Sequence, residues 1–145
     1  PAVILRLFLT YGPGQANSRF LPQIIKGCMN EVAFPTSEGQ QLRDFCYVSD
    51  IVCAILMALN VKNVEGEVFN IASGEPVTIR SMIDEVCGIV GMGDPQYGEI
   101  PYRPEENMAL YADISKAKKV LGWNPDVSLS EGLKKTIQWM KNANV

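Results

Sequence analysis

The sequence predicts an α/β fold, because short apolar runs alternate with segments of helical periodicity. Residues 3–9 are apolar apart from Arg6 and end at the turn YGPG, which is typical of a buried strand. The run VFNIAS at residues 68–73 has the same character. Two well-formed strands are few for a complete sheet, so we expect the chain to contribute them to a larger one.

Apolar residues at helical spacing predict two helices in the first half of the chain. The first runs from about residue 18 or 20 to residue 29, with Asn17 or Ser18 as its N-cap. A short strand, EVAFP, and a polar turn, TSEGQQ, follow it. The second helix starts at an N-cap at Ser49. Its residues leave few polar positions, so we expect it to be buried on most sides.

Capping signals mark the helices of the second half. Thr78 is expected to cap a helix that Gly91 ends. An irregular proline-rich stretch follows, with one short strand expected near residues 97–100, and then a short helix that ends at Gly122. The segment SLSE at residues 128–131 fits a capping box that opens the last helix.

The charge and the residue content exclude several classes of protein. The 145 residues carry a net charge of −3, so we expect no nucleic-acid partner. Histidine is absent, which excludes histidine-based catalytic triads and histidine metal sites, and we expect no metal site. The four cysteines form no C-x-x-C pair and are expected as buried free thiols of a cytoplasmic protein. No apolar run is long enough to span a membrane.

The loop YGPGQANSRF at residues 11–20 follows a strand and precedes a helix, which is the context of a dinucleotide-binding turn. Such a turn needs the pattern G-x-G-x-x-G. Asn17 stands where the third glycine is required, and Pro13 has no N–H to offer to a phosphate. We therefore expect that this loop does not cradle the phosphates of a cofactor.

Five segments in a fixed order carry a family resemblance over nearly all of the chain: RLFLTYGPGQ, LRDFCYVSDIVCAILMAL, GEVFNIASGEPVTI, PYRPEENMALYADISKAKKVLGW and SLSEGLKKTI. The chain resembles the C-terminal half of the extended short-chain dehydrogenase/reductase family. Members of this family are NAD(P)-dependent nucleotide-sugar epimerases, dehydratases and 4-ketoreductases. The resemblance implies that residues 1–145 are the C-terminal portion of such an enzyme. Residues 1–12 and 66–73 would then hold the last strands of a Rossmann-type parallel sheet, and the remainder a small, mostly helical substrate-binding region.

The resemblance also implies what the intact enzyme needs besides this chain. In the family, the N-terminal half carries the glycine-rich cofactor loop and a catalytic Tyr-x-x-x-Lys, and no tyrosine here is followed four places on by lysine. We therefore expect the chain alone to be inactive and to work with the N-terminal half of the same protein, which binds NAD or NADP. The intact enzyme is expected to be a homodimer. Because the chain opens inside a strand-like run, we expect it to be a C-terminal piece of a longer protein.

Two other functions remain open from the sequence. The chain is also compatible with a non-catalytic binding or scaffold module of the same fold. The family is broad, so a reductase that acts on a substrate other than a nucleotide-sugar is a further alternative.

Two arginines are the main candidates for binding the substrate. Arg43 lies in LRDF and Arg103 in PYRP, and in similar proteins the arginines of these motifs hold the diphosphate of the nucleotide-sugar. Guanidinium groups match phosphate oxygens as bidentate forks and stay charged. The alternative is that each arginine forms an ion pair, Arg43 with Asp44 or Glu38 and Arg103 with Glu105.

The resemblance implies further substrate contacts. In similar proteins the start of the helix after the opening loop touches the substrate; here these residues are Asn17, Ser18, Arg19 and Phe20. In similar proteins a short strand runs beside the nucleotide base, and Phe34 and Thr36 stand at the corresponding place in this sequence. Phe34 is equally suited to the hydrophobic core.

The resemblance also implies two residues near the cofactor, at the cleft where substrate and nicotinamide meet in the intact enzyme. By resemblance, Tyr11 and Pro13 close the nicotinamide side, and the alternative for Tyr11 is a packed loop aromatic. Leu9 departs from the family pattern, which often has asparagine at this place, where the amide meets the substrate. An apolar side chain cannot replace that hydrogen bond.

Overall fold

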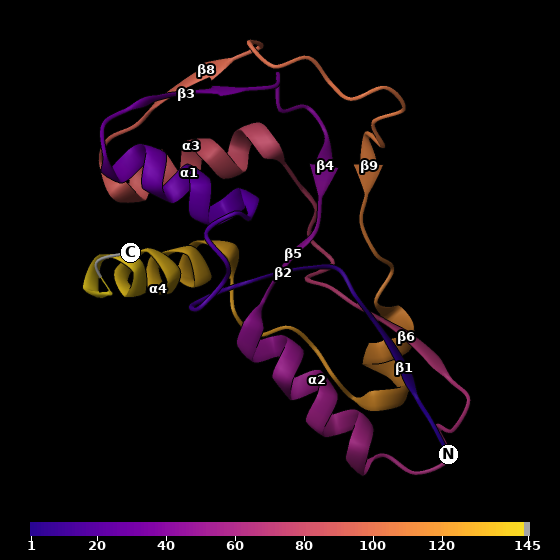
Figure 1. The fold of residues 1–145 in the computed structure, drawn as a ribbon. Helices are drawn as coiled ribbons and strands as arrows, with labels where there is room; N and C mark the ends of the chain where they lie inside the picture. Colours follow the sequence, from indigo (N-terminus) through magenta and orange to yellow (C-terminus); the bar gives the residue numbers. More distant parts are fainter. Residues whose placement is uncertain (144–145) are drawn as a thin grey trace.

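The computed structural model describes residues 1–143 and has the predicted α/β architecture (Figure 1). The helices are α1 (Phe20–Met29), α2 (Val48–Asn60), α3 (Ile79–Val90), the π-helical turn η1 (Ala117–Leu121) and α4 (Leu129–Asn142). The strands are β1 (Ile4–Leu7), β2 (Leu9–Tyr11), β3 (Ala33–Thr36), β4 (Leu42–Arg43), β5 (Phe45–Tyr47), β6 (Val68–Ile71), β7 (Val77–Thr78), β8 (Asp94–Tyr97) and β9 (Ala109–Leu110).

The strands pair in small groups, and most of the pairs are parallel. β1 runs parallel to β6, β2 to β5 and β3 to β8. β4 lies between β7, to which it is antiparallel, and β9, to which it is parallel. Parallel strands need a crossover connection, and α1 and α2 lie in the crossovers of the first two pairs. β1, β2 and β6 lie within the ranges 1–12 and 66–73, where sheet strands are expected; the division of the chain into two regions stays a prediction. The prediction of one buried strand over residues 3–9 is wrong: the run forms two strands, and Ile4 and Leu7 are exposed, because β1 pairs with β6 alone among the described strands.

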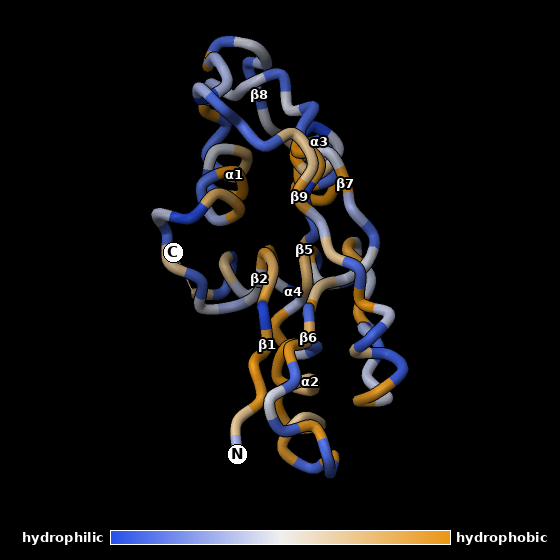
Figure 2. The backbone as a smooth tube through the Cα atoms, turned by 90° about the vertical axis from the view of Figure 1, so that its right-hand side faces the viewer, coloured by the Kyte–Doolittle hydropathy of each residue, from blue (hydrophilic) through white to orange (hydrophobic). Residues whose placement is uncertain are grey.

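Two hydrophobic clusters hold these elements together. Figure 2 shows hydrophobic segments of the chain in orange at α1 and α3 and again at β1 and α2. The first joins α1, α3, α4 and β5, and the second joins α2, β6 and the segment through η1. They meet at β5, where Phe45 and Tyr47 face the first cluster and Cys46 faces the second. This division follows from the period of two along a strand.

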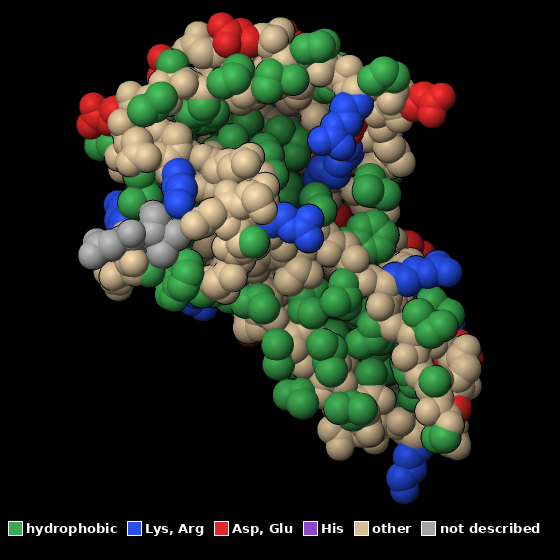
Figure 3. Space-filling model, viewed as in Figure 1, with side chains coloured by type: hydrophobic (Ala, Val, Ile, Leu, Met, Phe, Trp, Pro, Cys, Tyr) green, Lys and Arg blue, Asp and Glu red, His purple; other side chains and the backbone are tan. Residues whose placement is uncertain are grey.

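The prediction that the second helix is buried on most sides is wrong for the described structure. One side of α2, with Ile51 and Ala54, packs into the second cluster, and Val48 at its start packs against the first. Four large apolar side chains of the helix are exposed: Val52, Ile55, Leu56 and Leu59. They form the apolar surface seen over α2 in Figure 3.

The cysteines are free, but they are not all buried. Cys28 and Cys46 are buried as predicted, whereas Cys87 is half-buried. Cys53 is exposed, because it lies on the side of α2 that faces away from the second cluster. No helix among residues 1–143 has the length and apolarity that crossing a bilayer requires.

The caps of the third and fourth helices are confirmed. The side chain of Thr78 accepts a hydrogen bond from the backbone N–H of Ser81, and that of Ser128 accepts one from Glu131. Gly91 ends α3 in the left-handed conformation, with φ at 85°. Glycine is favoured in this conformation because it has no Cβ that would clash with the backbone.

The predicted caps of the first two helices are wrong. Arg19 is the N-cap of α1 in place of Asn17 or Ser18, and its side chain makes no capping hydrogen bond. Tyr47 is the N-cap of α2, and Ser49 lies inside the helix. The cap of α2 differs because β5 leads directly into this helix without an intervening turn.

Several short elements carry little signal in the sequence. β4, β5, β7 and β9 have two or three residues each, too few to show a period. β8 covers residues 94–97 rather than 97–100, because its register is set by pairing with β3. The short helix before Gly122 ends as predicted, and its last part is π-helical.

The buried carboxylate of Asp44 ties three distant segments together. Its side chain is fully buried and accepts hydrogen bonds from Ser73 N at 2.7 Å, Ser73 Oγ at 2.6 Å and Gly74 N at 3.1 Å. A longer bond of 3.5 Å comes from Ala112 N. The backbone carbonyl of Asp44 accepts a further bond from Leu9 N at 3.2 Å. Asp44 therefore fixes the β4–β5 segment relative to β2, to the turn after β6 and to the segment after β9.

Tyr11, the last residue of β2, is packed into the first cluster. Its ring is 2% exposed and meets the ring of Tyr47 edge-on at 5.5 Å between centroids. Its hydroxyl donates to the carbonyl of Leu129 at 3.3 Å. Burial raises the pKa of Tyr11 well above its ordinary value. This position depends on Gly132, because a Cβ there would lie 2.1 Å from the Tyr11 hydroxyl.

Gly132→Ala is expected to destabilise the protein although it replaces a glycine in a helix. The added methyl group would displace Tyr11 from its place against α4, which we expect to cost about 1–3 kcal/mol of unfolding free energy. Gly88→Ala is the matched control, since a Cβ at this helical position meets nothing within 4 Å. It should stabilise the protein by about 0.5–1 kcal/mol. Urea denaturation measures both, and stabilisation by both variants would contradict the packing argument.

Asp44→Asn is expected to destabilise the protein by about 2–4 kcal/mol. An amide group keeps the shape of the side chain, but its NH₂ group faces backbone N–H groups and leaves buried donors without an acceptor. Asp126→Asn is the control, because this aspartate is exposed and its replacement should change the unfolding free energy by less than about 0.5 kcal/mol. Denaturant titration compares the two, and equal midpoints would refute the role of Asp44.

Candidate functional site

A cavity of about 780 Å³ opens between the first hydrophobic cluster and the loop at residues 100–106 (Figure 3). Its wall comes from β2 and the loop after it, the first half of α1, the β3–β4 turn, β5 and residues 100–106. Basic side chains stand at the rim of the hollow in Figure 3. Ligand sites commonly have volumes of about 300–1,000 Å³, so this cavity has the size for a small-molecule ligand.

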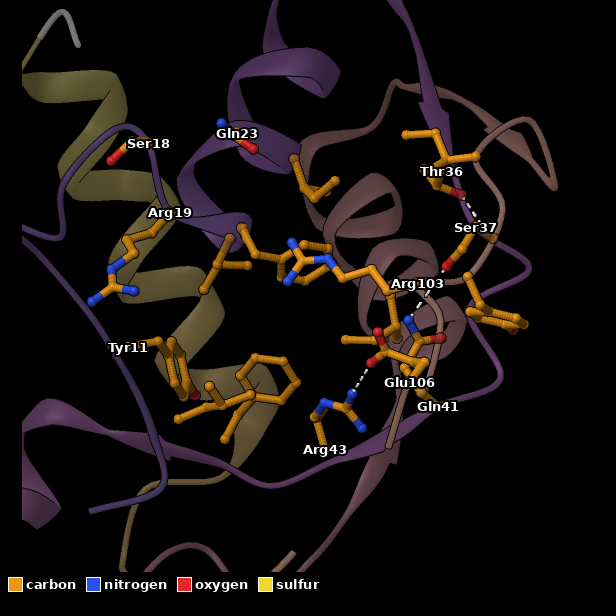
Figure 4. A pocket seen from close by; sticks show the side chains of 18 of the residues that line it. Tyr11, Ser18, Arg19, Gln23, Thr36, Ser37, Gln41, Arg43, Arg103 and Glu106 are labelled. Atoms are coloured by element: carbon orange, nitrogen blue, oxygen red, sulfur yellow. Dashed lines mark hydrogen bonds and ion pairs between the residues drawn. The ribbon is translucent and has the colours of Figure 1, made fainter. Parts of the chain in front are cut away.

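Arg43 lies at the end of β4 and points into the cavity (Figure 4). Its Nη1 donates to the carbonyl of Leu42 at 2.7 Å, and its Nη2 forms an ion pair with Glu106. The Arg43 side chain is 13% exposed. A guanidinium has five N–H donors, so these two contacts orient the group and leave donors for a ligand.

The ion pairs considered from the sequence as alternatives are wrong. Arg43 pairs with Glu106 and not with Asp44 or Glu38. Asp44 points into the interior, and Glu38 pairs with Arg80 at 3.0 Å. Among residues 1–143, no ion pair joins Arg103 to Glu105.

The loop that carries Arg103 is tied to the segment from the end of β3 to the end of β4 by three contacts. Ile100 N donates to the carbonyl of Thr36 at 3.0 Å, and Gln40 N donates to the hydroxyl of Tyr102 at 3.0 Å. The third contact is the ion pair between Arg43 and Glu106. Figure 4 shows Arg103 extending from this loop across the cavity. Arg43 and Arg103 are thus held at one site although they are far apart in the sequence.

Positive charge dominates the wall of the cavity. Arg19, Arg43 and Arg103 line it, and Glu106 is the acidic residue among the described lining residues. Arg43 and Glu106 are the partly buried pair, with the Glu106 side chain 20% exposed. The arrangement favours an anionic ligand, because two guanidinium groups are not balanced by a carboxylate.

The structure brings most of the predicted site residues to this wall. These are Tyr11, Ser18, Arg19, Phe20, Thr36, Arg43 and Arg103. Leu9 also lines the cavity and is 42% exposed. Their roles toward a ligand stay predictions.

Three predicted residues do not line the cavity. Pro13 and Asn17 are exposed and lie outside the wall. Phe34 packs on α1, where a Cβ on Gly27 would lie 2.6 Å from its ring. The aromatic ring of Phe34 belongs to the edge of the first cluster, which fits its alternative role in the core.

Sequence reasoning missed several polar residues of the wall, among them Gln15, Gln41 and Glu106. The Nε2 of Gln15 donates to Thr10 O at 3.1 Å, and that of Gln41 donates to Ser37 Oγ at 3.3 Å. The Oε1 atoms of both glutamines are buried and have no hydrogen-bond partner within the described part of the chain. The only signal for Glu106 in the sequence is its place three residues after Arg103.

Comparisons with known proteins agree on one family. The family model described as GDP-mannose 4,6 dehydratase matches residues 1–136. A UDP-glucuronate 4-epimerase of Thermodesulfobacterium geofontis is 32% identical, over 95% of this chain and 42% of its own length. UDP-glucuronic acid decarboxylase 6 of Arabidopsis thaliana is 37% identical, over 90% of this chain and 38% of its own.

Solved structures give the same result. The UDP-glucose 4-epimerase of Thermotoga maritima with UDP-glucose has a TM-score of 0.89 at 30% identity, covering 99% of this chain and 47% of that one. The UDP-glucuronic acid 4-epimerase of Bacillus cereus with UDP-glucuronic acid and NAD has a TM-score of 0.89 at 34% identity, covering 97% and 45%. This chain spans less than half the length of these relatives. It belongs to the GDP-mannose 4,6 dehydratase family of extended short-chain dehydrogenases/reductases and matches the C-terminal portion of their Rossmann-type fold.

Proposed function

We propose that this chain is the substrate-binding part of an NAD(P)-dependent nucleotide-sugar epimerase, dehydratase or 4-ketoreductase. The observation that supports this most directly is that Arg43 and Arg103 line one cavity. Two similar structures are complexes with UDP-glucose and with UDP-glucuronic acid. We assign the diphosphate of the nucleotide-sugar to the space between the two guanidinium groups.

The chemistry of the wall suits a diphosphate. Arginine donates two parallel N–H bonds to phosphate oxygens and stays charged at every physiological pH. Arg43 is already oriented by Leu42 O and Glu106, so little side-chain entropy is lost when it binds. The first residues of α1, Phe20 and Leu21, face the same space, where the positive end of the helix dipole adds to the attraction.

The two ends of the cavity differ in the ligand groups they suit. Thr36, Ser37 and Gln41 line one end together with the apolar Ile100, which suits the flat face and polar edge of a nucleobase. We place the sugar at the other end, near Leu9 and Tyr11. Leu9 offers no hydrogen bond there, so fewer polar contacts hold the sugar than an asparagine would allow.

The residues of this chain do not fit a dinucleotide site by themselves. Tyr11 and Pro13 are the expected cofactor contacts, and their role stays a prediction; in this chain the Tyr11 hydroxyl donates to Leu129 O and Pro13 is exposed outside the cavity. We therefore assign NAD or NADP binding, and the hydride transfer that it supports, to the N-terminal half of the intact protein. The present chain would bind and orient the nucleotide-sugar for that step.

Replacing either cavity arginine should weaken nucleotide-sugar binding. We expect Arg43→Ala and Arg103→Ala each to cost about 2–5 kcal/mol of binding free energy, which is about 30- to 5,000-fold in Kd. Isothermal calorimetry of the protein with UDP-glucose, UDP-glucuronic acid, GDP-mannose and dTDP-glucose measures this and also identifies the base.

Arg80→Ala is the matched control for this experiment. Arg80 also pairs with a glutamate, Glu38, but it does not line the cavity. Its removal should leave Kd within about twofold. The proposed function fails if none of the four nucleotide-sugars binds, or if the variants at Arg43 and Arg103 bind them as tightly as the unaltered protein.

A further inference from the structure

Cys28 and Cys87 face each other between two packed helices. Cys28 lies in the last turn of α1 and Cys87 in the last turn of α3, and their sulfur atoms are 3.4 Å apart. This is a contact between free thiols, since a disulfide bond is about 2.05 Å long. The two sulfur atoms must therefore approach by roughly 1.4 Å to form a disulfide bond. Rotation of the side chains and small shifts of the helices can supply this movement.

The backbone next to the two thiols leaves room for them to meet. Gly93 has a φ of 142°, and a Cβ at this position would lie 2.7 Å from Cys87 Sγ and 2.8 Å from Cys28 Sγ. Any other residue would therefore push against both sulfur atoms. Glycine, which has no side chain, thus occupies the position beside the two sulfur atoms.

The two thiols differ in their access to solvent. Cys28 is fully buried, and burial together with its hydrogen bond to Cys87 raises the pKa of the Cys28 thiol to about 12. Cys87 is half-buried, so a reagent in solution reaches Cys87 before Cys28. A more accessible thiol that reacts first and a second thiol in contact with it form the usual arrangement for thiol–disulfide exchange.

We infer that Cys28 and Cys87 form a reversible dithiol–disulfide pair that cross-links α1 to α3. The oxidant is a small disulfide such as oxidised glutathione. The Cys87 thiolate attacks one of its sulfurs and releases one glutathione thiolate, which leaves a mixed disulfide on Cys87. The Cys28 sulfur then loses its proton, attacks Cys87 Sγ and releases the second glutathione. Two protons and two electrons pass from the cysteines to the oxidant, which becomes two thiols.

The cross-link would join two helices that both begin at the cavity. Phe20, the first residue of α1, and Ile79, the first residue of α3, line its wall. A bond between the last turns of these helices limits how far the wall can move. The inference itself rests on the two thiols and does not depend on nucleotide-sugar binding.

The test uses the Cys53→Ser protein, so that the exposed Cys53 thiol does not couple two molecules. The protein is incubated with excess oxidised glutathione, quenched with acid, unfolded and alkylated with N-ethylmaleimide. Before alkylation, the intact mass should be about 2 Da lower than that of the reduced protein. Only Cys46 should be alkylated, and a non-reducing digest should contain a Cys28–Cys87 peptide. Dithiothreitol should reverse all of these changes. The midpoint of thermal unfolding should rise by roughly 5 °C or more.

A matched variant carries Cys87→Ser as well as Cys53→Ser. Because Cys87 is half-buried, this change is mild, and the variant should show neither the mass loss nor the rise in the unfolding midpoint. The inference is overturned if glutathione stays attached to Cys87 while Cys28 remains free to alkylate. It is also overturned if Cys28, Cys46 and Cys87 are all alkylated after oxidation.

Discussion

The carboxylate of Asp44 is the constraint on which the arrangement of the site depends. It is buried and holds the turn after β6 through Ser73 and Gly74, and it also accepts from the segment after β9. Burying a charge is unfavourable unless donors compensate it, so these segments are held where their N–H groups point at one place. The β4–β5 segment is thereby fixed at the centre of the molecule, between the two hydrophobic clusters.

The burial of Asp44 determines where the adjacent side chain of Arg43 points. In an extended backbone, adjacent side chains point to opposite faces, so when Asp44 is drawn into the interior, Arg43 is directed outward into the cavity. The same geometry explains why the ion pair of Arg43 with Asp44 does not form. Glu106 takes that role from the loop of Arg103, so one contact both orients the first arginine and anchors the loop of the second. The two cations of the site are therefore positioned by a connected set of bonds.

The sequence predicts the elements whose residues carry their own signal. The caps at Thr78 and Ser128, the stop at Gly91 and the strand β6 are local features, and the structure has them. The bounds of β4 and β9 and the partner of Arg43 depend on chain segments far apart in sequence, and periodicity holds no information about them. The exposed face of α2 shows the limit of composition: an apolar helix predicts burial, but which sides are covered depends on what packs against it.

The charge of the site also shows why net charge is a weak guide to ligands. The chain carries −3 overall, yet its cavity is lined by three arginines and one glutamate. Charges at the outer surface are screened by salt within about 8–10 Å, whereas a recessed site with apolar walls keeps its field. Phe20, Phe45 and Ile100 supply such walls here. A diphosphate entering the cavity would meet the local arginines at short range, and the acidic exterior would act on it only through solvent.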